Sequence, residues 1–249
     1  MTEESALDQA TRLMSLLWRD ALPPPARARG PRQGLSVDAV VRAGIAIADR
    51  DGYDRVSIRT VAAELGVRPM SLYTYVPGKE ALIMLMVDAV AAEDVPIDAA
   101  LPVRDRMAAI ARGVRAELLA HPWLLEVPPW RQVLGPGRIR RFERQLAALD
   151  GAGFDDLEMD RVIAVLSEFA TGNARMAVAA ARSAQEMSDA QWWEVHGPLL
   201  TQVMPVADYP LSSRVGAAAG QAYEAPGDPD GAFDYGLARL LDGIENHPR

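Results

Sequence analysis

The side chains best equipped to bind a polar partner lie close together between residues 57 and 80. In this segment, SIRTVAAELGVRPMSLYTYVPGKE, helical spacing buries Leu72 and Val76. The remaining side chains of the same helix then face partly outward: Met70, Ser71, Tyr73, Thr74 and Tyr75. Hydroxyl groups and rings offer hydrogen bonds and contact area rather than acid-base chemistry. The pattern therefore indicates a surface that touches a partner.

Two short helices joined by a glycine turn are predicted to hold this surface. Ser57 is placed to cap the first helix, and Gly66 sits where a helix end favours a left-handed residue. The second helix starts at Arg68, with Pro69 where a missing N–H costs least. Small proteins use this helix-turn-helix arrangement to put one helix into the DNA major groove. We therefore expect double-stranded DNA as the partner.

The distribution of charge agrees with a DNA-binding segment. The net charge of the whole chain is −8, which taken alone disfavours nucleic acid. From Pro24 to Glu80, however, nine Arg and Lys residues stand against six Asp and Glu, whereas residues 81–249 hold 15 against 24. A modest basic module on an acidic body leaves only one face that attracts DNA.

Composition excludes several other classes of function. The chain has no cysteine, and its three histidines show no metal-ligand spacing. We therefore expect no enzyme activity, no metal site and no cofactor. The N-terminus, MTEESALDQA, is acidic where a secretion signal would be basic, and no stretch approaches about 18 uncharged apolar residues. These features predict a soluble, cytoplasmic protein with no membrane partner.

Helical periodicity throughout the chain predicts an all-α fold in three parts. Residues 1–34 form an N-terminal helix and a basic arm, whose arginines at 27, 29 and 32 either reach DNA or only solubilise the chain. Residues 35–80 form the helix-turn-helix domain, and residues 81–249 form a larger helical body. The helix expected from Gly78 to about Asp94 is long enough to connect the two, which makes it a candidate lever.

Further helices are expected in the body at 103–120, 123–127, 138–149, 156–183, 191–204 and 231–245. The one at 191–204 is expected to be interrupted at Gly197-Pro198. The long helix at 156–183 and the last helix carry broad apolar faces. These faces form either a monomeric core or a four-helix interface with a second copy. A homodimer gains weight because one recognition helix makes few contacts and usually works in a symmetric pair.

Several motifs resemble the TetR family of ligand-responsive transcriptional repressors. In the small domain they are SIR at 57–59, AAELGV at 62–67, LYTYV at 72–76 and GKEAL at 78–82. The body is similar to the tetracycline-repressor branch in QLAALDGAGF at 145–154, FATG at 169–172 and AFDYGLARLLDGIE at 232–245. The resemblance implies an N-terminal three-helix helix-turn-helix DNA-binding domain followed by a larger helical ligand-binding and dimerisation domain.

The resemblance also implies which residues bind DNA. The family positions that face DNA correspond to Arg59, Arg68, Pro69, Met70, Ser71, Tyr73, Thr74 and Tyr75, and Lys79 matches a phosphate-contacting lysine. The chemistry suits these roles, because arginine can pair with guanine or grip phosphate and hydroxyl groups can donate to phosphate oxygens. The threonine can bring its methyl group to thymine.

The body departs from the tetracycline-repressor branch where that branch holds a magnesium–drug chelate. The neighbourhoods that match its histidine and glutamate read VPPW at 127–130 and Met176, so no metal triad is present. We expect a pocket among the same helices for a metal-free, apolar or aromatic effector. Its candidate lining, in which Gln145 matches a polar ligand-contacting position, is Trp130, Phe142, Gln145, Phe169, Asn173 and Met176.

These features predict a homodimeric repressor that a small molecule releases from a palindromic operator. The alternative is a helical small-molecule carrier that does not bind DNA, because its pocket would look the same. Salt-dependent binding to a specific duplex distinguishes the two.

Overall fold

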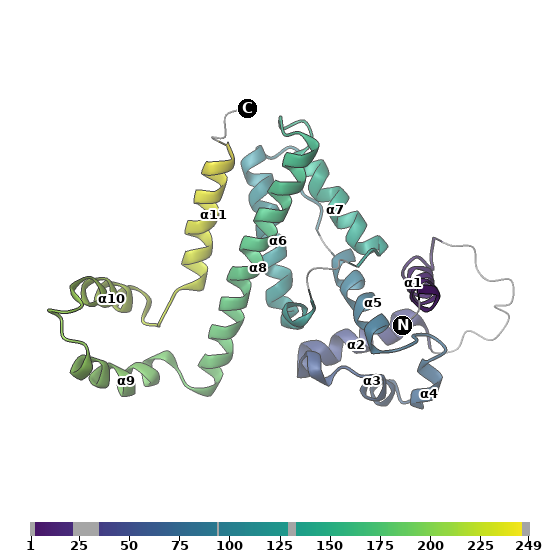
Figure 1. The fold of residues 1–249 in the computed structure, drawn as a ribbon, viewed down its shortest axis with the longest axis horizontal. Helices are drawn as coiled ribbons and strands as arrows, with labels where there is room; N and C mark the ends of the chain where they lie inside the picture. Colours follow the sequence, from purple (N-terminus) through teal and green to yellow (C-terminus); the bar gives the residue numbers. More distant parts are fainter. Residues whose placement is uncertain (1–2, 22–34, 94, 129–132, 246–249) are drawn as a thin grey trace.

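A computed structural model describes residues 3–21, 35–93, 95–128 and 133–245. The predicted basic arm and Trp130 lie outside the described residues. Within these ranges the chain forms α-helices and two short 3-10 helices but no strand, so the predicted all-α fold is confirmed (Figure 1). The elements are α1 (Glu3–Leu17), α2 (Val37–Asp51), η1 (Tyr53–Arg55), α3 (Ile58–Glu64), α4 (Pro69–Leu72), α5 (Lys79–Ala92), α6 (Val103–Ala120), η2 (Pro122–Glu126), α7 (Pro136–Leu149), α8 (Asp156–Glu186), α9 (Asp189–Val203), α10 (Pro210–Tyr223) and α11 (Pro229–Glu245).

The small domain packs around side chains from α2, α3, α4 and α5. Val40, Val61, Leu72 and Leu82, one from each helix, are fully buried and share one apolar cluster. Ser36 begins the domain as the cap of α2, where its Oγ accepts a hydrogen bond from the backbone N–H of the third helical residue at 3.1 Å. Because α5 buries its side chains in this cluster, the helix that was expected to be a lever is part of the small domain's core.

The end of α1 is fastened to the rest of the molecule at three points. Leu17 is buried in the small-domain cluster beside α5. The Nε1 of Trp18 donates a hydrogen bond to the carbonyl oxygen of Leu134, at 2.8 Å, and Arg19 forms an ion pair with Asp38 of α2. The helix therefore contacts both the small domain and the segment that leads into α7 (Figure 1).

A second junction joins α5 to the start of α7. Asp88 of α5 is buried, and its carboxylate accepts hydrogen bonds from the backbone N–H groups of Gly137, at 3.2 Å, and Arg138, at 2.9 Å. A negative charge at a helix N-terminus is favourable because the free N–H groups there carry partial positive charge. The two helices touch so closely that a Cβ at Gly137 would lie 2.0 Å from the backbone oxygen of Asp88. This contact fixes α7 against the small domain.

The body forms a second apolar cluster among α6, α7, α8 and α11. Met107, Leu149, Leu166 and Leu237, again one from each helix, are fully buried there. Asp155 starts the long helix α8 with a capping box, in which Asp155 and Glu158 each accept a hydrogen bond from the other's backbone N–H. In Figure 1, α8 runs beside α6 through the centre of the body, with α11 on its other flank.

Helices α9 and α10 extend away from this body as an arm (Figure 1). Neither contains a buried residue. The sequence predicted a break at Gly197-Pro198, and this was wrong: α9 continues through Pro198, at the cost of one backbone donor. Helix α10 was not predicted, because its Ser-, Ala- and Gly-rich sequence lacks a regular apolar stripe. Within the described residues, no helix has the length and apolarity required to span a bilayer.

Candidate DNA interface and effector cavity

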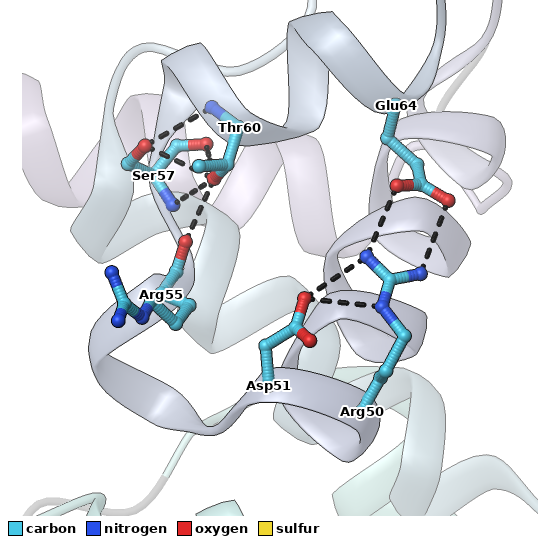
Figure 2. A network of polar contacts seen from close by, with 6 residues as sticks. All are labelled: Arg50, Asp51, Arg55, Ser57, Thr60 and Glu64. Carbon is cyan, nitrogen blue, oxygen red and sulfur yellow. Dashed lines mark hydrogen bonds and ion pairs between the residues drawn. The ribbon is translucent and has the colours of Figure 1, made fainter.

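Local hydrogen bonds set the geometry of the helix-turn-helix. Ser57 and Thr60 form a capping box at the start of α3, and the Thr60 hydroxyl also donates to the carbonyl oxygen of Arg55, at 2.8 Å (Figure 2). At the other end of α3, Gly66 adopts φ +66°, the left-handed conformation predicted for it. The Val67 N–H then bonds to the Ala62 oxygen at 2.9 Å, which closes the turn into α4.

An ion-pair network holds α3 against the end of α2. The Arg50 guanidinium lies 3.2 Å from a carboxylate oxygen of Glu64 and 3.0 Å from one of Asp51 (Figure 2). The hydrogen bonds that the Arg50 guanidinium donates to Asp51 and Glu64 raise the pKa of Arg50 above its ordinary value. Because the guanidinium stays charged at all physiological pH values, this tie orients α3, and with it the turn that follows.

The predicted DNA-facing side chains lie on and beside α4. The buried side chains of Leu72 and Val76 pack this segment against the small domain. Met70 is 75% exposed and Tyr73 is 49% exposed. Also exposed are Arg59, Arg68, Pro69, Ser71 and Thr74, while Tyr75 is half-buried. Neither Arg59 nor Arg68 forms an ion pair within the described part of the chain, so both guanidinium groups are available to a partner.

Lys79, the first residue of α5, is held by an aromatic ring. Its Nζ lies 4.8 Å from the centroid of the Tyr53 ring, and Tyr53 itself packs against the small-domain cluster. An ammonium group is disfavoured at a helix N-terminus by the helix dipole. The face of the tyrosine ring offsets this cost and restricts where the ammonium can lie.

The body contains a cavity of about 560 Å³ between the end of α5, the segment that follows it, α6 and α7. This volume is within the usual range of small-molecule sites. Among the described residues the lining is mostly aliphatic and contains no Phe, Tyr or Trp side chain. Its residues are Val90, Glu93, Val95, Pro96, Ile97, Asp98, Leu101, Ala109, Ile110, Gly113, Val114, Ala116, Glu117, Ala120, His121, Arg141 and Gln145.

Three polar side chains of α6 and α7 give the cavity its buried chemistry. Arg141 and Glu117 form a largely buried ion pair, in which a guanidinium nitrogen lies 2.8 Å from a carboxylate oxygen. Gln145, one helical turn after Arg141, is only 8% exposed, and its side chain makes no hydrogen bond within the described residues. Its amide is therefore free to bond to a molecule inside the cavity.

His121 connects the cavity wall to the small domain. Its backbone N–H donates a hydrogen bond to the carbonyl oxygen of Glu117 at the end of α6. The imidazole, however, points elsewhere: Nδ1 lies 2.8 Å from Oδ1 of Asp49 in α2. The Nε1 of Trp123 donates to the same oxygen, also at 2.8 Å. One carboxylate of the small domain thus receives two groups from the body, and one of them lines the cavity.

Of the side chains predicted to contact a ligand, Gln145 lines this cavity and the other described ones do not. Phe169 stacks on Phe233 of α11, with ring centroids 5.4 Å apart. Asn173 accepts a hydrogen bond from Arg115 and donates one to the carbonyl oxygen of Pro229. Phe142 is 39% exposed and Met176 is 64% exposed on the outer surface of their helices.

Sequence reasoning missed Glu117, His121 and Arg141 as cavity residues. The sequence signal that could have indicated them is a pair of polar residues, Arg141 and Gln145, one helical turn apart on the buried face of α7. The described residues contain no group of three or more His, Asp or Glu side chains arranged to hold a metal ion.

Two family descriptions match the chain. Residues 40–84 match "Bacterial regulatory proteins, tetR family", and residues 100–247 match "Tetracyclin repressor-like, C-terminal domain". The chain is 35% identical over 248 residues to the HTH-type transcriptional repressor DrrR1 of Streptomyces coeruleorubidus, covering 98% of this chain and 88% of that protein. Its relatives are transcriptional repressors rather than enzymes.

Solved structures of TetR family proteins are also similar to this chain. Apo ActR from Streptomyces coelicolor is 27% identical, with a TM-score of 0.68, and the match covers 85% of this chain and 95% of that one. ActR in complex with actinorhodin is 26% identical, with a TM-score of 0.70 and coverage of 86% and 96%. With a helix-turn-helix at one end, a helical body at the other and relatives that match almost its full length, the chain belongs to the TetR family of transcriptional repressors.

Proposed function

We propose that this repressor binds a palindromic operator as a homodimer and is released when a small molecule enters the cavity between α5, α6 and α7. The observation that carries the proposal is the exposed face of α4. Leu72 of α4 and Val76, which follows it, are fully buried, whereas Ser71, Tyr73 and Thr74 are exposed, as are Arg59 and Arg68, which form no ion pair within the described residues. Such a face has no role in the fold of a single chain and suits the edges of a duplex.

In this proposal Arg68, at the start of α4, reads a base edge or grips phosphate, and Arg59, at the start of α3, does the same from the neighbouring helix. Ser71, Tyr73 and Tyr75 donate hydrogen bonds to phosphate oxygens, while Met70, Pro69 and Thr74 supply apolar contact. Lys79 binds backbone phosphate with its ammonium group directed by Tyr53. Phosphate contacts set the register on the duplex, and base contacts supply the specificity.

A second copy of the chain is the partner that the body's exposed apolar surface favours. Val165 and Met176 of α8 and Tyr235 of α11 are exposed. Val203 of α9 and Leu211 of α10 are also exposed, and neither of these two helices contains a buried residue. Apolar area of this extent on a helical face is typical of an interface. A two-fold dimer then places two copies of α4 about one helical turn of DNA apart, ~34–36 Å.

Release requires that the effector prefer one of two arrangements of body and small domain. Two contacts of the cavity wall can transmit this preference. His121 lines the cavity and contacts Asp49 of α2, while α7, which carries Arg141 and Gln145, is fastened to α5 through Asp88. Near-complete release requires a differential affinity of about 5.5 kcal/mol between the two arrangements.

The test is sequence-specific DNA binding. Duplexes retained by the purified protein are sequenced, and binding to the enriched operator is measured as a function of salt. Arg68→Ala should weaken operator binding by ~1–3 kcal/mol, or roughly 5- to 150-fold. Arg112→Ala, which replaces another exposed arginine, on α6, serves as the matched control and should leave operator binding unchanged. A folded protein that retains no specific duplex would instead favour the carrier alternative.

A further inference from the structure

The sulfur chemistry of this protein belongs entirely to methionine. The chain has ten methionines and no cysteine. Met86 and Met107 are fully buried, whereas Met70 on α4 is 75% exposed, more than any other methionine that the structure describes. Because oxidants reach a thioether from solvent, the side chains most open to water react first. Met70 is therefore the sulfur of the described chain that an oxidant meets most readily.

Met70 lies on the surface of α4 and takes no part in its anchoring. It is the second residue of the helix, and its neighbours Pro69 and Ser71 are exposed as well. Leu72, two positions later, holds the helix in the small-domain cluster, whereas Met70 is a member of neither apolar cluster of the described residues. A chemical change at Met70 can therefore alter what α4 binds without disturbing the buried contacts that hold the fold.

Oxidation turns this apolar side chain into a polar one. Hydrogen peroxide transfers one oxygen atom to the thioether: the sulfur lone pair forms the S–O bond, the O–O bond of the peroxide breaks, and water leaves. The sulfur loses two electrons and the peroxide gains them. The product, methionine sulfoxide, carries a hydrogen-bond acceptor but no donor. Phosphate oxygens are acceptors as well, so a sulfoxide pressed against a duplex loses its water without gaining a partner.

We propose that Met70 is a reversible oxidation site, at which a peroxide weakens the binding of this repressor to its operator. The inference rests on the proposed function, which places Met70 in apolar contact with the duplex. It adds a second input to that function, because oxidation acts on α4 directly and needs no effector in the cavity. Methionine sulfoxide reductases return the sulfoxide to the thioether at the expense of thiols, so the change can be undone.

The experiment oxidises the purified protein and measures operator binding without an effector. Hydrogen peroxide is applied until peptide mass spectrometry shows that Met70 is converted, and catalase then removes the excess. We expect the Kd for the operator to rise about tenfold, which is the effect of burying one unpaired polar group. Methionine sulfoxide reductases A and B with dithiothreitol, one enzyme for each epimer, should restore the original Kd. Saturating operator should slow the conversion of Met70, because the duplex covers it.

Matched variants assign the effect to one sulfur. Met70→Leu keeps an apolar side chain of similar size, so peroxide should not change the Kd of this variant. The triple variant Met14→Leu, Met176→Leu, Met187→Leu removes the other exposed sulfurs of the described chain. It retains Met70 and should lose affinity on oxidation as the parent protein does. Each variant is compared with its own unoxidised sample, and circular dichroism measures whether the helices survive oxidation.

Resistance of Met70 to conversion, an unchanged Kd once it is converted, an equal loss of affinity in Met70→Leu, or no recovery with the reductases would overturn the inference. Conversion that is as fast with operator as without it, or a loss of helix on oxidation, would also overturn it. A protein that binds its operator equally well before and after conversion loses this inference and retains its proposed function. A protein that retains no specific duplex before oxidation loses the proposed function, and the inference with it.

Discussion

The junction between α5 and α7 gives the sharpest stability prediction. Asp88 is buried and accepts hydrogen bonds from two backbone N–H groups, at 2.9 Å and 3.2 Å, at the start of α7. Replacing a helix cap with alanine costs about 1 kcal/mol, and a hydrogen bond to a charged group contributes about 1.5–3 kcal/mol. These values overlap, because the cap consists of the same bonds. We expect Asp88→Ala to lower the free energy of unfolding by about 2–4 kcal/mol.

Two companion variants make this test specific. Asp88→Asn keeps one acceptor oxygen but loses the charge and one of the two hydrogen bonds, because its NH2 group cannot accept from the second backbone N–H, so its cost should be about 1–3 kcal/mol. Asp105→Ala removes an exposed acid from the first turn of α6, where the carboxylate has no hydrogen-bond partner among the described residues, and should change stability by at most about 0.5 kcal/mol. The free energies come from urea unfolding followed by circular dichroism, at one fixed protein concentration because association shifts apparent stability. If Asp88→Ala and Asp105→Ala are equally mild, the junction does not hold the two parts together as argued.

Three smaller effects follow from other contacts. Gly66→Ala should destabilise the protein by about 1–2 kcal/mol, because φ is +66° at this position and alanine is strained in that conformation. Gly66→Asn should destabilise it by less, because asparagine tolerates the left-handed conformation better. Equal urea midpoints for the two variants would contradict this explanation. Tyr53→Leu should weaken operator binding roughly two- to fivefold and lower its salt dependence, whereas Tyr53→Phe keeps the ring face over Lys79 and should change neither. Operator titrations at several salt concentrations measure both effects. An equal loss in both variants would show that the hydroxyl group matters instead. Asp155→Ala removes the cap of α8 and should cost about 0.5–2 kcal/mol in thermal unfolding, with an unchanged melting temperature as the contrary result.

The DNA-facing half of the molecule was predictable because its signals are local. Ser57 caps α3 and Gly66 takes the left-handed conformation, as expected from the sequence. The bounds of α6 were also predicted, because His121-Pro122 ends it. These features depend on neighbouring residues and on buried positions at helical spacing, both of which a single sequence displays.

The cavity was harder to predict because small residues create it. An alanine or glycine on α6 gives no sequence signal that distinguishes an open wall from close helix packing. Phe169 and Asn173 gave the opposite problem. Their side chains look suited to a ligand, but α11 occupies them through Phe233 and Pro229. Which helix covers which face is a tertiary fact, and periodicity along one helix does not contain it.

The attachment of α1 bears on where this chain can be shortened. The matched family region begins at residue 40, so the segment before it looks dispensable. Yet Leu17 fills part of the small domain's interior, and Trp18 reaches the Leu134 carbonyl, 116 positions further along the chain. Deleting the residues before position 40 would expose the apolar side chains of α5 that Leu17 covers and would remove the hydrogen bond from Trp18 to Leu134. The end of α1 thus belongs to the architecture of this repressor, although it lies before the matched family region.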